Sequence, residues 1–273
     1  MEIPKWIMQH SKPLSGLLSL TLILAAGAQA QFDPTDGLVG YYPFNGNAND
    51  ESVNSNDGNV SGAQLDLDRF GNPSRSFSFS GYPEYIETTA AVGFPSGTED
   101  FTVSLWVQVA SLPPDAQILF CNSVVGDFEL TIYRTTTGST APMDFMMGGD
   151  YGVPEVRTAD VLWESGRWYN VQLVRSGNHF AIYRDATVIG ENDVDSTITA
   201  PPGSRNIRFG LGVPPQVHQF GGGLDDIRIY NRALSGDDVG ALYRLESVPE
   251  PQTYALAFAV GLIGFGIIRR RSR

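Results

Sequence analysis

The sequence predicts an all-β sandwich. The first observation is a nine-residue run, 101–109, in which every second side chain is apolar, as in a half-buried strand. The second is that short runs rich in valine, isoleucine, phenylalanine and tyrosine recur between clusters of glycine, proline, asparagine and aspartate. The third is length, because residues 31–247 suit one large sandwich domain and contain no internal repeat or long linker.

The alternation in 101–109 indicates which side chains of this strand face the core. Its odd-numbered residues, from Phe101 to Val109, share one face, and we expect that face in the core. The even-numbered residues share the other face and include Trp106, which we expect at a sheet edge or under a loop.

The remaining elements follow from the same patterns. Further strands are predicted at 38–44, 76–80, 85–87, 117–121, 128–133, 144–147, 168–175, 180–184, 207–211 and 224–230. The turn Ser176-Gly177-Asn178 predicts a hairpin between two of them. One helix is predicted at 236–245, because Ser235 is a typical N-cap residue and Asp238 follows three residues later.

Several segments, in this order along the chain, resemble the laminin G-like (LamGL) domains of bacterial surface proteins. They are 37–50, 57–58, 69–72, 76–81, 101–107, 168–175 and 223–235. The resemblance implies a concanavalin A-like jelly roll over 31–247, with two packed antiparallel sheets of about six or seven strands each, about 10 Å apart. It also implies that the first and last strands pair.

The N-terminal segment 1–30 has the parts of a secretory signal peptide. Lys5 and Lys12 precede an apolar stretch at 14–26, and Ala28-Gln29-Ala30 is a cleavage site for signal peptidase before Gln31.

The C-terminal segment 248–273 combines three physically different pieces. Val248-Pro249-Glu250-Pro251 is held extended by its prolines, an apolar run covers 254–268, and the chain ends Arg269-Arg270-Arg271-Ser272-Arg273. Basic clusters prefer the cytoplasmic side of a membrane. A helix over 253–268 would be about 24 Å long, short for a permanent anchor in a hydrocarbon core of about 30 Å.

These three pieces together resemble the PEP-CTERM sorting tail of Gram-negative bacteria. The resemblance implies a transient transmembrane helix at the inner membrane, recognition by an exosortase and cleavage near Pro249-Glu250-Pro251. The expected destination is the cell surface or the extracellular matrix. An ordinary C-terminal membrane anchor is the alternative.

The composition is acidic, with a formal net charge of −12 at pH 7. Both lysines and four arginines lie in the two terminal segments, so the part between them is more acidic still. Such a surface repels nucleic acid. Cys121 is the only cysteine, which excludes an intrachain disulfide, and its apolar neighbours predict a buried structural thiol.

One loop is rich in oxygen ligands. Residues 49–58 contain many carboxylate and amide side chains, and Ca²⁺ binds about six to eight such oxygens. In laminin G-like domains a loop aspartate often joins groups distant in sequence. We therefore expect a calcium site formed by Asp50 and Asp225, with Asn56 as a third ligand. The alternative is an asparagine- and aspartate-rich turn that bonds its own backbone.

The sequence does not point to catalysis. Glycosidases need two carboxyl groups about 5–10 Å apart, and the E-x-D-x-x-E pattern of concanavalin A-like glucanases is absent. The acidic run 191–195 is expected in a loop. We therefore expect no enzyme, although a glycosidase or lyase on this fold remains the alternative.

Function is expected to be the binding of glycan or protein, and a purely structural matrix role is a further alternative. Four aromatic residues in predicted loops, Tyr82, Tyr151, Trp163 and Phe220, either stack on sugars or cover the ends of the sandwich.

Overall fold

The computed structural model describes residues 32–89, 97–112, 116–122, 128–132, 139–147, 155–197, 206–212 and 218–249. The predicted signal peptide and the sorting tail from Glu250 onward lie outside these residues. Val248 and Pro249 are the last residues described. Within the described ranges, no helix is long and apolar enough to span a bilayer.

Strands make up most of the described chain. The strands are β1 (Leu38–Tyr42), β2 (Gly58–Ser61), β3 (Gln64–Asp66), β4 (Ser76–Phe79), β5 (Tyr85–Thr88), β6 (Phe101–Val109), β7 (Gln117–Asn122), β8 (Phe128–Ile132), β9 (Thr140–Ala141), β10 (Met143–Met147), β11 (Val156–Arg157), β12 (Val161–Leu162), β13 (Trp168–Ser176), β14 (His179–Arg184), β15 (Thr187–Asp193), β16 (Ile207–Phe209) and β17 (Gly222–Tyr230). The helix is α1 (Gly236–Glu246).

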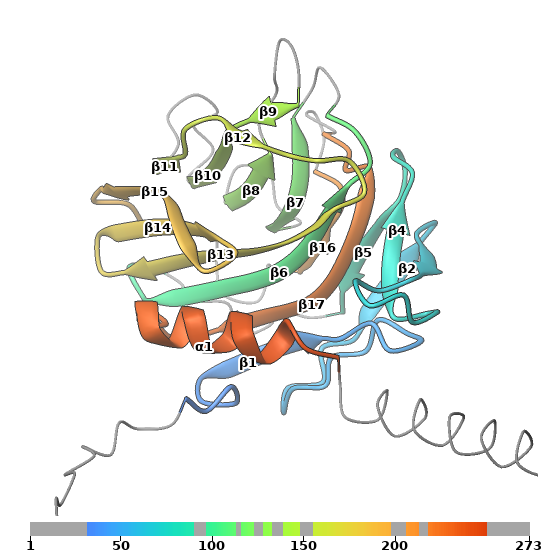
Figure 1. The fold of residues 1–273 in the computed structure, drawn as a ribbon. Helices are drawn as coiled ribbons and strands as arrows, with labels where there is room; N and C mark the ends of the chain where they lie inside the picture. Colours follow the sequence, from blue (N-terminus) through green and yellow to red (C-terminus); the bar gives the residue numbers. More distant parts are fainter. Residues whose placement is uncertain are drawn as a thin grey trace, which may run out of the picture. The chain divides into compact units, whose positions relative to one another are not determined.

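The strands form two main antiparallel sheets, as the sequence predicts (Figure 1). The eight-stranded sheet has the order β15-β14-β13-β6-β17-β4-β3, and β1 also pairs with β17. The seven-stranded sheet has the order β11-β10-β8-β7-β16-β5-β2, and β9 and β12 form a separate pair. The predicted pairing of the first and last strands is confirmed, with Tyr41 opposite Arg228.

The core lies between the two sheets. Aromatic rings meet across it in edge-on contacts, Tyr42 of β1 with Phe209 of β16 and Phe101 of β6 with Phe145 of β10. All four side chains are fully buried. Burial of such a side chain stabilises the fold by about 1.5–3 kcal/mol. Strands with one apolar face therefore gain stability when two sheets pack those faces together.

Helix α1 covers the opposite face of the eight-stranded sheet (Figure 1). Its N-terminus is the predicted capping box, with Ser235 accepting from the Asp238 N–H and the Asp238 side chain accepting from the Ser235 N–H. Val239 and Leu242 pack against Tyr230 in a second buried cluster. On the even-numbered face of β6, Thr102, Ser104 and Trp106 are therefore also buried.

The observed position of Trp106 differs from the one predicted from the sequence. It lies under α1 rather than under a loop, stacked on Tyr243 with the ring centroids 5.9 Å apart. The sequence marks the helix but does not show which sheet face the helix covers.

The acidic run 191–195 was wrongly predicted as a loop throughout, because Glu191 and Asp193 lie in strand β15. β15 is an edge strand that pairs with β14, where His179 lies opposite Asp193 and its Nδ1 is 2.8 Å from Asp193 Oδ1. A strand at a sheet edge needs no apolar face, so its exposed side chains hide it from hydrophobic patterning. The short strands β2 and β3 were missed for the same reason.

Candidate functional site

The Asp50 carboxylate organises the polar loop after β1. Its Oδ1 accepts from the N–H groups of Tyr41 and Ser52, and its Oδ2 accepts from the Ser52 hydroxyl and the Asn56 N–H, at 2.8–2.9 Å. A carboxylate has about four lone-pair positions, and these contacts use all of them. The Asp50 carboxylate thus bonds groups of β1 and of its own loop.

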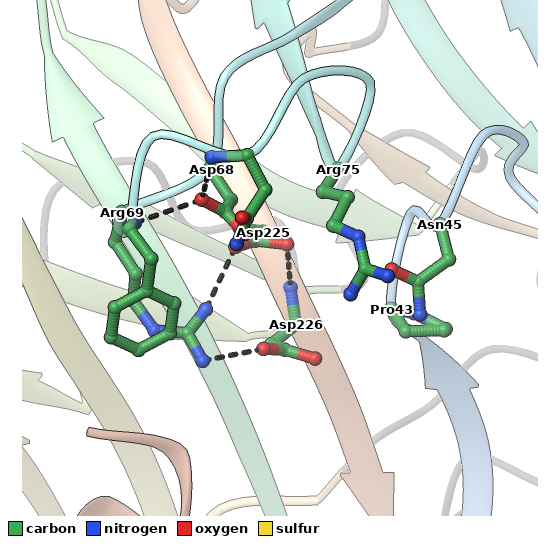
Figure 2. A pocket seen from close by; sticks show the side chains of 9 residues that line it. Pro43, Asn45, Asp68, Arg69, Arg75, Asp225 and Asp226 are labelled. Atoms are coloured by element: carbon green, nitrogen blue, oxygen red, sulfur yellow. Dashed lines mark hydrogen bonds and ion pairs between the residues drawn. The ribbon is translucent and has the colours of Figure 1, made fainter. Parts of the chain in front are cut away.

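Asp225 lies in a second polar cluster, beside Asp226 and Arg69 (Figure 2). The register between β17 and β6 shifts after Asp225, and Asp226 has a φ of 43°. Successive side chains of a regular strand point to opposite faces, but a bulge re-aims them. Arg69 can thus bind both carboxylates, Nη1 to Asp225 at 2.7 Å and Nη2 to Asp226 at 2.8 Å.

The pocket around this cluster is small and charged. Its volume is about 20 Å³, which is room for about one water molecule. Burial, and then the neighbouring Asp226 carboxylate, raises the pKa of Asp225 well above its ordinary value. The Arg69 guanidinium is the counter-ion of Asp225 and Asp226 in this pocket.

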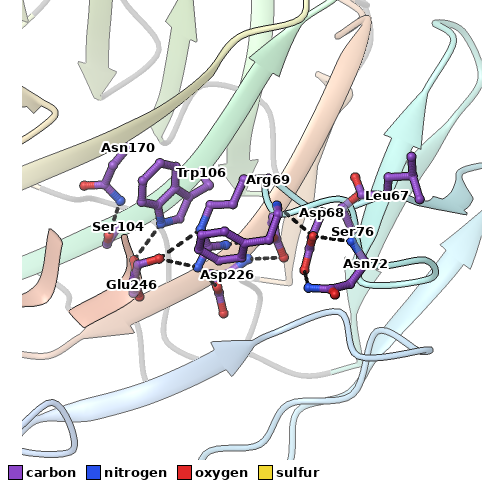
Figure 3. Close-up of polar contacts among 12 residues, drawn as sticks. Leu67, Asp68, Arg69, Asn72, Ser76, Ser104, Trp106, Asn170, Asp226 and Glu246 are labelled. Atoms are coloured by element: carbon purple, nitrogen blue, oxygen red, sulfur yellow. Dashed lines mark hydrogen bonds and ion pairs between the residues drawn. The ribbon is translucent and has the colours of Figure 1, made fainter. Parts of the chain in front are cut away.

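The same network reaches the end of α1 (Figure 3). Glu246 accepts from Arg228 Nε at 2.6 Å and from the Trp106 indole N–H at 2.8 Å. Its backbone carbonyl accepts from Arg69 Nε at 3.0 Å. Burial, followed by the charge of Asp226, raises the pKa of Glu246 to about 7. The network therefore fastens α1 to the eight-stranded sheet.

Tyr41 contacts both acidic regions that contain the predicted calcium ligands. Its backbone N–H donates to Asp50, while its hydroxyl, at the far end of the side chain, donates to Asp226. No hydrogen bond or ion pair joins Asp50 to Asp225 in the described part of the chain. Across those same residues, no group of three His, Cys, Asp or Glu side chains is arranged to hold a metal ion.

A second set of mostly polar residues lies on the outer face of the seven-stranded sheet, exposed at Asn59 and buried at Cys121 and Glu129. Residues in direct register on neighbouring strands share a face, and a continuous row follows from the pairings of six strands. We call it the polar row, and it consists of Asn59, Glu87, Arg208, Cys121, Glu129 and Met146. Their neighbours in sequence, such as Ile86, Phe209 and Leu130, point into the core.

One end of the polar row opens into a pocket of about 260 Å³. It is lined by Asn59, Tyr85, Glu87, Thr88, Thr89 and Asn206. Glu87 accepts from Arg208 Nε at 3.0 Å, and the Arg208 guanidinium lies 4.4 Å from the centroid of the Tyr85 ring. The pocket thus combines an aromatic ring with amide, hydroxyl and carboxylate groups, the mixture that fixes a polar ligand in place.

The middle of the row holds a buried acid, Glu129. Its side chain is 9% exposed, and its Oε1 accepts no hydrogen bond from the described residues. Burial, and then the nearby Asp144 carboxylate, raises the pKa of Glu129 to about 7. Asp144 is itself bonded to Arg157, with Nε 2.8 Å from Oδ1.

The other sequence candidates are mostly structural. Cys121 is buried as predicted, and burial raises the pKa of its thiol. Trp163 and Phe220 are buried packing residues, whereas Tyr82 is 67% exposed. Tyr151 lies outside the described residues.

Sequence reasoning missed Tyr85, Glu87, Arg208 and Glu129 as a set. The alternation in 85–87 marks a strand with one outward face, but its partners come from positions far apart in the chain. Only the strand order brings them into one row.

The two antiparallel sheets with a polar outer face define a concanavalin A-like sandwich with a candidate binding surface. The chain belongs to the concanavalin A-like lectin/glucanases superfamily, and the Laminin_G_3 model of that superfamily matches residues 80–240. The laminin G-like resemblance of the sequence is therefore confirmed at the level of the domain. No curated protein matches the chain.

Solved structures share the fold at low sequence identity. Domain 4 of AbnA, a GH43 extracellular arabinanase from Geobacillus stearothermophilus, in complex with arabinotriose, has a TM-score of 0.57 at 16% identity, over 76% of this chain and 98% of that chain. The ligand binding domain of botulinum neurotoxin serotype D, in complex with N-acetylneuraminic acid, has a TM-score of 0.54 at 13% identity, over 77% of this chain and 51% of that chain. This chain thus spans about half of the neurotoxin domain, and both likenesses show the fold alone.

Proposed function

We propose that this protein is an exported, non-catalytic surface or extracellular-matrix protein whose sandwich binds glycan on the outer face of the seven-stranded sheet. The observation that carries the proposal is the pocket at the end of the polar row. A half-buried tyrosine ring beside amide, hydroxyl and carboxylate groups suits a sugar, which presents C–H faces to a ring and hydroxyls to polar groups. A protein ligand is the second candidate.

The structural neighbours support a binding role for such a sandwich. The arabinanase domain is described in complex with arabinotriose, and the neurotoxin domain in complex with N-acetylneuraminic acid. The arabinanase domain and about half of the neurotoxin domain share the fold of this chain, although their sugar-contacting residues are not carried over to it.

The pairing of charges supports a non-catalytic role. A glycosidase uses two carboxyl groups that face one substrate. On the outer face, Glu87 is bonded to Arg208 and Asp144 to Arg157, so Glu129 is the one acid of the polar row without an arginine partner among the described residues. Turnover of any polysaccharide by the full chain in a hydrolysis screen would contradict this part of the proposal.

The binding pocket is tested by the change Tyr85→Ala. We expect the full chain to bind an oligosaccharide from a glycan array and Tyr85→Ala to lower its affinity at least about tenfold, because the ring is lost. Isothermal titration calorimetry measures the affinity. Tyr82→Ala is the matched control, since Tyr82 is exposed and lies outside the pocket. A loss of affinity in the control alone would place the site elsewhere.

Export and sorting complete the proposal. The partners are signal peptidase and an exosortase-type machinery, and the 248–273 segment serves as a transient inner-membrane helix. We expect the protein recovered from the cell surface or matrix to begin at Gln31 and to lack the arginine cluster. Intact-mass measurement checks both ends. A mass that retains the arginine cluster would favour the ordinary anchor.

Structural calcium at Asp50, Asn56 and Asp225 stays a prediction. A ligand that binds only the folded state raises the melting temperature. The measurement is the melting temperature with added Ca²⁺ and with EGTA. A difference of several degrees that Asp225→Asn removes would support the site, and equal melting temperatures would count against it.

A further inference from the structure

Among the described residues, Glu129 is the one carboxylate of the polar row that has no arginine partner. On either side of it the outer face carries carboxylates that are matched by arginines, Glu87 by Arg208 and Asp144 by Arg157. Glu129 has no such partner among the described residues, and it is nine-tenths buried. A buried acid without a donor costs free energy in every fold, so its presence calls for an explanation.

The groups around Glu129 indicate which functional group of a ligand could bind it. Cys121 of β7 and Met146 of β10 lie opposite it in register, Asp144 lies on the neighbouring strand, and Arg208 of β16 is one strand beyond Cys121. Arg208 is already bonded to Glu87. Among the described residues, Glu129 Oε1 therefore lacks a hydrogen-bond donor, and the ionised carboxylate lacks an arginine partner. A protonated amino group supplies both.

We propose that Glu129 binds the amino group of an amine-bearing glycan, so that the polar row selects sugars with a free amine over N-acetylated ones. This inference rests on the proposed glycan-binding function and names its ligand class. One sugar would occupy the Tyr85 pocket, and the amino group of another would reach Glu129 by displacing side chains that bury this part of the row.

We expect Met146 to be the side chain that covers Glu129. Oε1 is screened from solvent, so an incoming amine must displace a covering side chain. Met146 is directly opposite Glu129 and only partly buried. A methionine side chain is unbranched and changes rotamer readily, so it serves as an adaptable cover.

The experiment compares glucosamine oligosaccharides with N-acetylglucosamine oligosaccharides of the same length, titrated into the full chain and into Glu129→Gln. We expect the wild-type chain to bind the free-amine form more tightly, and Glu129→Gln to lose about ten- to a hundredfold of that affinity. The affinity for the N-acetylated form should not change. Glu51→Gln, an exposed loop variant, is the control and should behave as wild type.

The pH dependence is a second readout. Below about pH 7 Glu129 is protonated in the free chain, and a sugar amine, like an α-amino group, loses its proton near pH 7–8. Wild-type affinity for the free-amine oligosaccharide should therefore peak near neutral pH. Glu129→Gln should lack the fall on the acid side.

Folding of the variant is checked by its melting temperature. The folded chain holds a proton on Glu129 up to about pH 7, whereas an unfolded glutamate releases it near pH 4.5. Wild-type stability therefore falls as pH rises through this window, and Glu129→Gln lacks that fall. Both chains still contain Glu246, so its contribution cancels. The variant should melt at a higher temperature than wild type at pH 8 and at a similar one at pH 4.5.

The outcomes separate the two proposals. Equal affinity for both oligosaccharides, unchanged in Glu129→Gln, would overturn the selectivity for amines and leave glycan binding intact. That result would mean that Glu129 bonds only water. Failure of both oligosaccharides to bind, while Tyr85-dependent binding to a neutral glycan persists, would also overturn the inference alone. Loss of all glycan binding in the wild-type chain would overturn the proposed function as well.

Discussion

Replacing Arg69 with methionine should destabilise the protein by about 3–5 kcal/mol. Arg69 binds Asp225 and Asp226 and also the backbone carbonyl of Glu246. Its side chain is 9% exposed and its guanidinium lies 4.6 Å from the Trp106 ring centroid. Methionine keeps much of the packing but leaves the buried Asp225 and the partly buried Asp226 without this counter-ion. The free energy of unfolding from urea denaturation measures the loss.

Two further variants show whether the lost charge is the cause. Arg167→Met removes an arginine whose partner Glu164 is half exposed, and it should change stability little. Asp225→Asn together with Asp226→Asn in the Arg69→Met background should restore part of the stability, because no unpaired charge remains. If the triple variant is no more stable than Arg69→Met, the loss comes from packing rather than from charge.

Replacing Gly222 with alanine should disrupt the pairing of β17 with β6 and leave little folded protein. Gly222 has a φ of 153°, and a Cβ built there would lie 1.9 Å from the carbonyl oxygen of Gln108. Neither backbone can give way without separating the two strands. β17 lies between β6 and β4 and also pairs with β1, so the damage would reach the centre of the eight-stranded sheet.

The neighbouring glycine is the matched control. A Cβ added at Gly221 would meet no atom within 4 Å. Gly221→Ala should therefore fold and melt close to wild type, while Gly222→Ala should show reduced soluble yield and a lost or much lowered cooperative melting transition. Circular dichroism on both variants measures this. Equal melting temperatures would show that the strands tolerate the side chain.

Local patterns were reliable where one residue type or one alternation decides the structure. Ser235 and Asp238 form the predicted capping box because both partners lie within one turn of the helix. The alternation in 101–109 identifies β6 because one face must be apolar to meet the other sheet. β15 escaped prediction because its pairing with β14, rather than its side chains, makes it a strand.

At the candidate sites, residue types alone did not predict the contacts that the structure shows. The sequence singled out Asp50 and Asp225 by residue type, whereas the structure shows Asp50 bonded to β1 and its own loop and Asp225 paired with Arg69. Nothing local to Arg69 reveals this contact, because 156 positions separate the two residues. Asx turns and calcium loops use the same residue types, so composition alone does not separate them.

The sequence by itself determined the all-β class, the laminin G-like domain, the capped helix and the pairing of the first and last strands. These follow from side-chain alternation and turn chemistry, which act over a few residues, and from the order of matched segments. Only the tertiary structure decided that α1 buries Trp106 and that a bulge presents Asp225 and Asp226 to one arginine. It also decided that Glu129 Oε1 has no donor among the described residues. These depend on strand order and register, which are set by contacts between residues far apart in the chain.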